Sequence, residues 1–152
     1  MTFRTLAGIV FGVLMGLILA GCAGEDRLTL DDARAMTDGV MRAIADEVPG
    51  GVVEDVSADS PYLRCGNGYT YSARWAVTPD EAFRGEDFVR DLPGRLGEDF
   101  VIDEEVVDVS YPAVALNHAS GIILDVIIAD VDGREVVDVY AIAPCASGEL
   151  PE

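Results

Sequence analysis

The sequence predicts an α+β fold, a mostly antiparallel β-sheet with two helices packed on one face. Three observations lead to this prediction. An apolar stripe with helical spacing starts at Leu30, a period-two alternation runs from Tyr69 to Val77, and two further alternating runs meet at an Asp-Gly turn near the C-terminus. One sheet face is then apolar and the other polar, although the last hairpin is apolar enough to be covered on both faces.

The first helix is expected to begin after Thr29, which can cap it together with Asp32, and to end at Pro49-Gly50-Gly51. An acidic face lies opposite its apolar stripe, whereas helices that lie on membranes carry basic residues there. The stripe therefore indicates a core-packing face rather than a membrane-lying helix. Its members are Leu30, Ala33, Met36, Val40, Ile44 and Val48.

A second helix is expected to begin at Thr78-Pro79-Asp80-Glu81, which has the pattern of a capping box with proline at the first helical position. Pro93-Gly94 should kink or interrupt it, because proline removes a backbone donor. The helical region should end by Gly97. Its apolar face consists of Phe88, Val89, Leu92 and Leu96.

The last two strands, Gly121–Ala129 and Arg134–Ala143, should form a hairpin around Asp130-Val131-Asp132-Gly133, because Asp-Gly favours a tight turn. The alternative, a calcium-binding EF-hand loop, would need ligands where the chain has Ile128 and Val139. Other strands are expected at Val52–Val56, Tyr62–Cys65, Tyr69–Val77, Val101–Val109 and Ala113–Asn117.

The N-terminus has the layout of a secretory signal, with one cation, Arg4, and an uncharged run from Leu6 to Ala20. As a helix this run would span roughly 22 Å, which is shorter than the roughly 30 Å hydrocarbon core of a bilayer. We therefore expect a cleaved signal at residues 1–21. The alternative is a buried apolar helix.

Leu19-Ala20-Gly21-Cys22 resembles a bacterial lipobox. The resemblance implies that the sulfur of Cys22 receives a diacylglycerol and that Cys22 becomes the first mature residue. Two acyl chains anchor a protein stably, whereas one holds it only marginally. The expected location is the extracytoplasmic face of the cell membrane. The alternative is an ordinary secretory cleavage site that leaves Cys22 as an unpaired thiol.

The mature chain would comprise a lipidated cysteine with a short tether (22–28), a single domain (29–148) and a tail (149–152). Its formal net charge would be −19, against −18 for the whole chain, because Arg4 leaves with the signal. Nucleic acid is an implausible partner, since phosphate binding needs cationic stripes. Anionic lipid headgroups should repel such a domain.

Two cysteines, Cys65 and Cys145, remain once Cys22 is assigned to the lipid. In an exported protein an even pair predicts a disulfide, and the alternative is two separate buried thiols. The order of elements, together with the ending Ala143-Pro144-Cys145, resembles small actinobacterial lipoproteins of unassigned function. That resemblance is one of layout and implies no catalytic residues.

The sequence distinguishes no catalytic set, and we expect neither an enzyme nor a metal or cofactor. His118 is the only histidine, and no Gly-x-Ser-x-Gly elbow surrounds Ser110 or Ser120. Acidic clusters at 103–108 and 86–87 resemble glycosidase pairs. In a chain with 28 carboxylates, however, such neighbours are expected on a solvated face.

Tyr69, Tyr71 and Trp75 are the candidate binding residues, because together they could line a groove for a sugar or a lipid. The alternative is a core face covered by a helix. The expected function is a non-catalytic binding or accessory module of the cell envelope, tethered near its partner. A structural or regulatory subunit of a membrane complex is the first alternative, and an enzyme acting on wall or lipid substrates is the second.

Overall fold

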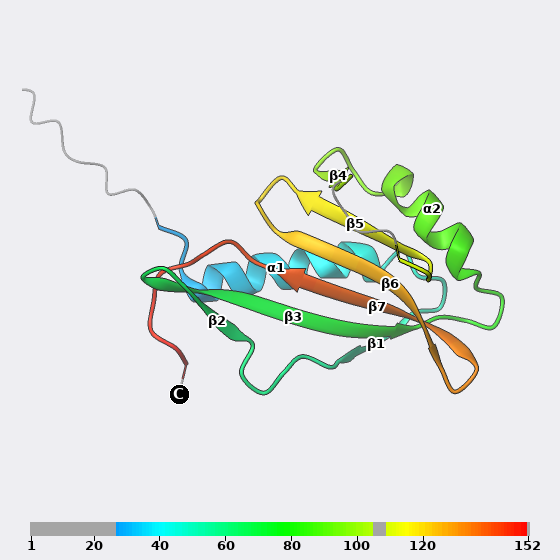
Figure 1. The fold of residues 1–152 in the computed structure, drawn as a ribbon, viewed down its shortest axis with the longest axis horizontal. Coiled ribbons are helices and arrows are strands. Elements are labelled where there is room, and N and C mark those ends of the chain that lie inside the picture. Colours follow the sequence, from blue (N-terminus) through cyan, green and yellow to red (C-terminus); the bar gives the residue numbers. More distant parts are fainter. Residues whose placement is uncertain (1–26, 105–108, 152) are drawn as a thin grey trace, which may run out of the picture.

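The computed structural model describes residues 27–104 and 109–151. Within them, two helices pack against a seven-stranded antiparallel sheet with the strand order β1-β3-β7-β6-β5-β4, and β2 pairs with β3 beside β1 (Figure 1). The α+β class predicted from the sequence is confirmed. The elements are α1 (Leu30–Ala45), β1 (Val52–Asp55), β2 (Tyr62–Cys65), β3 (Gly68–Thr78), α2 (Gly85–Arg95), β4 (Phe100–Ile102), β5 (Ala113–His118), β6 (Ile123–Val131) and β7 (Arg134–Ile142).

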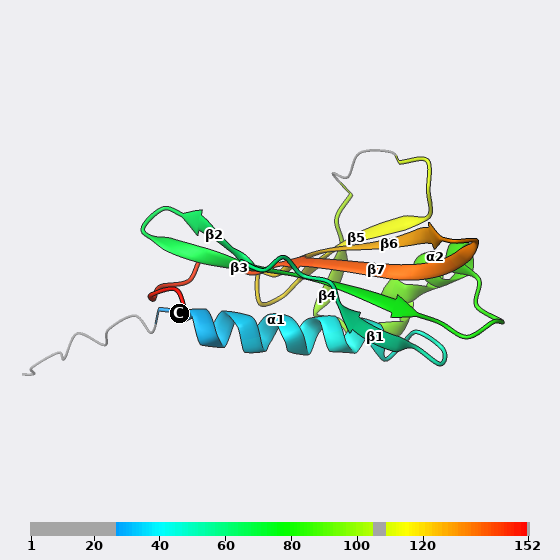
Figure 2. The ribbon, with the colours of Figure 1, turned by 90° about the horizontal axis from the view of Figure 1, so that it is seen from below.

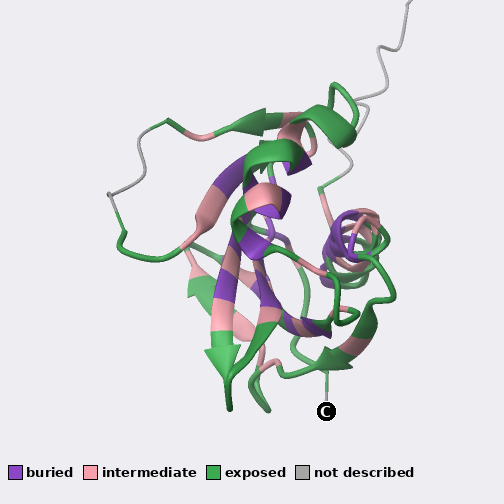
Figure 3. Cartoon of the chain, turned by 90° about the vertical axis from the view of Figure 1, so that its right-hand side faces the viewer, coloured by how far each residue is buried: buried purple, intermediate pink, exposed green. Residues whose placement is uncertain are grey.

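Both helices lie on the same face of the sheet. The register sets Trp75 of β3 beside Val139 of β7 and Val139 beside Val126 of β6, so these side chains share one face. In Figure 2, α1 runs below the sheet, and the side view in Figure 3 places the buried residues between the sheet and the helices. The helices therefore cover the apolar face, as the period-two alternation predicts.

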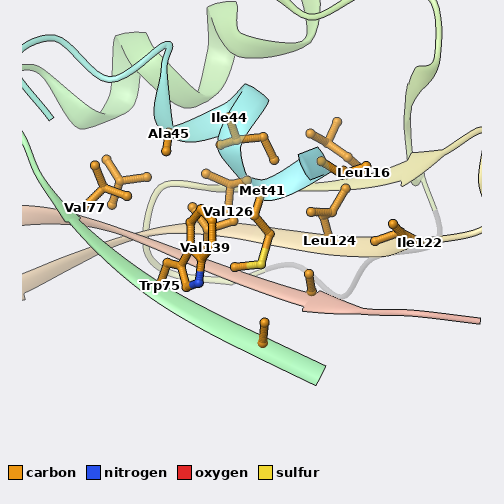
Figure 4. Close-up of a cluster of buried hydrophobic side chains, with 14 of the residues drawn as sticks. Met41, Ile44, Ala45, Trp75, Val77, Leu116, Ile122, Leu124, Val126 and Val139 are labelled. Carbon is orange, nitrogen blue, oxygen red and sulfur yellow. The ribbon is translucent and has the colours of Figure 1, made fainter. Parts of the chain in front are cut away.

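The core forms where α1 crosses β3, β7 and β6. Met41 and Ile44 project from the helix onto Trp75, Val126 and Val139 (Figure 4), and these side chains are buried. Fully burying an aliphatic side chain of this size contributes about 1.5 to 3 kcal/mol. The stripe predicted for the first helix is therefore the packing face of α1.

The start of α1 follows the sequence prediction. The Thr29 hydroxyl accepts a hydrogen bond from the backbone N–H of Asp32 at 3.1 Å and donates one to the Asp32 carboxylate at 2.6 Å. One of the four unpaired N–H groups of the first helical turn is thereby satisfied. The regular helix ends at Ala45, three residues before the predicted Val48.

The predicted start of the second helix is wrong, because α2 begins at Gly85 rather than at Pro79. Thr78 is still part of β3 and pairs with Val52, while the Asp80 side chain accepts from the N–H of Ala82 at 3.1 Å. The cap comes from β7, where the Glu135 carboxylate accepts from the N–H of Gly85 at 3.0 Å. The helix is not interrupted at Pro93 and runs to Arg95.

The hairpin of β6 and β7 is confirmed, with a tighter turn than predicted. The ladder extends to Val131 and Arg134, and only Asp132 and Gly133 remain in the turn, at φ 55° and 78°. These positive angles are those of a type I′ turn, which matches the twist of the strands. The strand predicted at Val101–Val109 is also too long, since β4 ends at Ile102 and residues 105–108 lie outside the described residues.

No helix of the described residues lies over the second face of the sheet, which we call the open face (Figure 2). One row across it contains no charge, and Ile123 within that row is half exposed. The expectation that the last hairpin is covered on both faces is therefore not met by the described elements. The row consists of Ser72, Ile142, Ile123, Asn117 and Val101.

Candidate functional site

The described chain begins at the end of the molecule that also holds the β2–β3 turn (left in Figures 1 and 2). We call it the tether end, because the tether predicted at residues 22–28 would join the domain there. The carbonyl of Leu28 accepts hydrogen bonds from the Ser147 backbone N–H at 2.8 Å and from the Ser147 hydroxyl at 3.3 Å. Thr29 forms a parallel bridge with Ser147. The backbone is thus fixed to the domain from the sixth residue after Cys22, which itself lies outside the described residues.

A disulfide between Cys65 and Cys145 fastens this end, with a Cα–Cα distance of 5.9 Å. The predicted pairing is confirmed. Closing a loop of this length stabilises the fold by about 4 to 5 kcal/mol in the chain-entropy model. The bridge joins β2 to the segment that follows β7.

The C-terminal segment is also hydrogen bonded to β3. Tyr69 and Ala146 exchange two backbone hydrogen bonds at 3.0 and 2.8 Å. Gly68 allows this approach, because a side chain there would collide with the carbonyl oxygen of Ala146. The segment around Ala146 therefore lies between β3 and Leu28, so that the tether exit and the β2–β3 hairpin form one cross-linked unit.

The β2–β3 hairpin carries exposed apolar and cationic side chains. Leu63 is 51% exposed, and the Arg64 guanidinium lies over the Tyr69 ring, 5.5 Å from its centroid. At Gly66 the backbone has φ +56°, and a side chain there would meet no atom within 4 Å. The hairpin turn therefore projects from the domain.

Beside this turn lies a hollow of about 330 Å³. It separates the tether exit from the β2–β3 hairpin, with Arg27 on one side and Asn67 on the other. The residues with polar side chains that line it are Arg27, Asn67 and Ser147. Such groups can hydrogen bond to an anionic oxygen.

Two of the three candidate binding aromatics belong to the core. Tyr71 and Trp75 are buried beneath α1, where the Arg42 guanidinium lies 4.7 Å from the centroid of the Trp75 ring. Tyr69 is half buried against the C-terminal segment. The structure does not bring the three rings together in an open groove.

A polar cluster that the sequence reasoning missed surrounds Tyr71. The Tyr71 hydroxyl donates to Asp38 at 3.4 Å, and Arg34 lies 3.9 Å from the same carboxylate. Burial, followed by the charge of Asp38, raises the pKa of Tyr71 to about 12. Burial also raises the pKa of Asp38, against the opposing effect of Arg34. The tyrosine therefore stays protonated and donates a hydrogen bond to the Asp38 carboxylate.

His118 and Ser120 are close because they share one turn. The Ser120 N–H donates to His118 Nδ1 at 3.1 Å, the Ser120 hydroxyl lies 2.7 Å from the same nitrogen, and the Phe100 ring meets the imidazole edge-on at 4.7 Å. A nitrogen that accepts a backbone N–H is the unprotonated one. This geometry closes the β5–β6 turn.

Glu86 of one acidic cluster lines a hollow between α2 and the residues that flank the other cluster, Ile102 and Val109. Asp87 forms ion pairs with Arg84 at 3.7 Å and with Arg90 at 2.8 Å. The cluster at 103–108 lies partly outside the described residues. No group of three or more His, Cys, Asp or Glu side chains in the described ranges could hold a metal ion.

No helix among the described residues is long and apolar enough to cross a membrane. Comparison of the chain with protein families, with curated proteins and with solved structures finds no match. The candidate site is therefore defined by its own geometry, which is the cross-linked tether end.

Proposed function

We propose that the chain is a cell-envelope lipoprotein, a non-catalytic binding or accessory module that Cys22 tethers to the extracytoplasmic face of the membrane. The observation that carries the proposal is the fixed tether exit. Leu28 is hydrogen bonded to Ser147, so only residues 23–27 link the lipobox cysteine to the folded domain. Five residues reach at most about 17 Å.

The disulfide supports export, because disulfides persist in oxidising compartments and are rare in the cytosol. Cys65 and Cys145 pair with each other. Cys22 is then the one cysteine of the chain left for a lipid. This assignment agrees with its position after the signal-like run.

A short tether suits a binding module. It holds the domain close to the bilayer, so a partner in the same membrane is met at high effective concentration. The nine arginines and 28 acidic residues of the mature chain favour a partner with a cationic surface, because complementary charge steers association.

The anchor is tested by metabolic labelling with palmitate and by mass spectrometry of the protein from the membrane fraction. The native chain should carry the label and a diacylglyceryl adduct on Cys22. Cys22→Ala should lose both and keep its signal. Label retained on Cys22→Ala would disprove the anchor.

The binding role is tested by crosslinking in intact cells. One dominant membrane or wall protein captured by the lipidated chain, and lost with Cys22→Ala, is the expected result. Hydrolysis of a wall or lipid substrate by the purified domain would overturn the non-catalytic assignment.

A further inference from the structure

We infer that the β2–β3 hairpin, through Leu63 and Arg64, is the part of the domain that contacts the membrane, and that it binds an anionic phospholipid surface although such a surface repels the rest of the acidic domain. The inference rests on the proposed lipid anchor at Cys22. It adds which part of the domain meets the bilayer and which lipid chemistry that part selects.

The first argument is position. Tyr69 is hydrogen bonded to Ala146, and the next residue, Ser147, is hydrogen bonded to Leu28. The hairpin and the tether exit lie at the same end of the molecule in both views (Figures 1 and 2). A tether of at most about 17 Å therefore brings the hairpin to the bilayer surface.

The second argument is charge. The chain has 28 acidic residues, yet none occurs from Ser60 to Pro79, the stretch that contains β2 and β3. Acidic residues at the tether end belong to other segments, with Glu25 and Asp26 in the tether, Asp31 and Asp32 in α1 and Glu149 in the C-terminal segment. An anionic surface repels those carboxylates and attracts Arg64. The domain is thus turned with its hairpin toward the lipid.

The third argument is side-chain chemistry. Leu63 lies on the open face of the hairpin and is half exposed. Arg64 lies on the opposite face beside Tyr69, whose ring is half buried against the core. At a membrane–water interface an exposed apolar side chain such as Leu63 enters the lipid, and arginine reaches the phosphates. The hollow between Arg27 and Asn67 lies beside the turn and has room for a phosphate group. The hairpin therefore offers both an apolar and a cationic contact.

The test places a tryptophan at each end of the sheet in the full-length, lipidated protein. Leu63→Trp probes the hairpin. Val131→Trp is the matched control, because Val131 is 48% exposed, against 51% for Leu63, and lies beside the β6–β7 turn at the other end (Figure 1). The native Trp75 is buried and supplies the baseline.

Each variant is reconstituted in vesicles of phosphatidylglycerol and phosphatidylcholine whose acyl chains carry bromine near the headgroup. The fluorescence of Leu63→Trp should be quenched at least about twofold more than that of Val131→Trp. Adding Arg64→Glu to Leu63→Trp should lower the quenching in anionic vesicles to about that of Val131→Trp, while the acyl chains on Cys22 keep the protein bound. Adding Arg134→Glu, at the far turn, should leave the quenching unchanged.

Equal quenching of the two tryptophans in the lipidated protein would overturn this inference and leave the anchor intact. If Arg64→Glu leaves the quenching of Leu63→Trp unchanged in anionic vesicles, the proposed preference for anionic lipid is wrong. A photocrosslinker placed at residue 63 gives a further readout in intact cells. Capture of one membrane protein there, without quenching of Leu63→Trp by lipid, would show that the hairpin contacts a protein and would overturn the inference. A mature chain without an acyl group would overturn both the inference and the proposed function.

Discussion

Asp138 is a buried carboxylate on the open face of the sheet, and Arg74 is its partner. The Arg74 Nε donates to the two carboxylate oxygens at 2.9 and 3.1 Å. The two side chains differ in exposure, 57% for Arg74 and 12% for Asp138. Removal of Asp138 therefore leaves an arginine that water hydrates, whereas removal of Arg74 leaves a buried charge without a partner.

Arg74→Ala should cost about 3 kcal/mol of unfolding free energy, because it leaves a buried carboxylate without a counter-charge. Asp138→Asn should cost only about 1 kcal/mol, since the amide still accepts from an arginine that solvent reaches. Urea denaturation of the Cys22→Ala protein measures both values. Equal costs would show that the carboxylate is better hydrated than its burial indicates.

The burial of Tyr71 should make the unfolding free energy depend on pH in the alkaline range. Its pKa is about 12 in the folded protein, against about 10 for an unfolded tyrosine. The folded state therefore keeps a proton that the unfolded state loses, and stability should fall as the pH rises from about 10 to about 12.

Tyr71→Phe should remove this part of the decline while costing about 1 kcal/mol at neutral pH through the lost hydrogen bond to Asp38. Chemical denaturation from about pH 8 to about pH 11.5, a range that includes most of this titration window, measures the unfolding free energy of both proteins. If the unfolding free energy of the native protein falls with pH no more steeply than that of Tyr71→Phe, the titration of Tyr71 does not cause the decline. Tyr111→Phe is the control for the loss of a tyrosine hydroxyl, because Tyr111 is exposed.

Among the elements, those with a local signal are the ones that the sequence predicts well. The alternation in β3, the Thr29 cap and the Asp-Gly turn each depend on residues within a few positions. The start of α2 does not. Thr78 is held in the sheet by Val52, and the cap is supplied by Glu135, which is 50 residues away in sequence. A competing long-range contact overrode the local capping box.

Glu135→Ala should therefore destabilise the first turn of α2 by about 1 kcal/mol, because Arg84 offers no side-chain cap. The amides of Gly85 to Phe88 should exchange with deuterium faster than in the native protein. Glu81→Ala is the control, since Glu81 is exposed and belongs to the capping box that the structure does not use. Faster exchange of these amides in Glu81→Ala than in Glu135→Ala would show that the capping box at Thr78–Glu81, and not Glu135, stabilises the start of α2.

At the scale of the whole molecule, the candidate site combines predicted and unpredicted parts. The pairing of Cys65 with Cys145 followed from their number, and it is confirmed. The exposure of Leu63 could not be predicted, because it depends on the register of β2 and β3 and on the face that the helices leave open. Likewise, the burial of Trp75 required knowing where α1 lies.

The net charge of −18 on the whole chain predicts how the stability of the domain responds to salt. Repulsion among excess carboxylates destabilises the compact state, and salt screens it, with a Debye length of about 10 Å at 0.1 M. The opposing loss of ion pairs is small, because the exposed pairs on α1 and α2 contribute only about 0.3 to 0.5 kcal/mol each. The Arg74–Asp138 pair is partly buried and is screened less. We therefore expect the relief of repulsion to outweigh the loss of ion pairs.

The melting temperature of the Cys22→Ala protein should accordingly rise by several degrees when sodium chloride is raised from about 0.02 to about 0.5 M. Arg134→Glu makes the chain two charges more negative at an exposed turn, so its melting temperature should be lower at low salt and approach the native value at high salt. A melting temperature that falls with salt would mean that specific ion pairs, and not the excess of carboxylates, dominate the electrostatics of the domain.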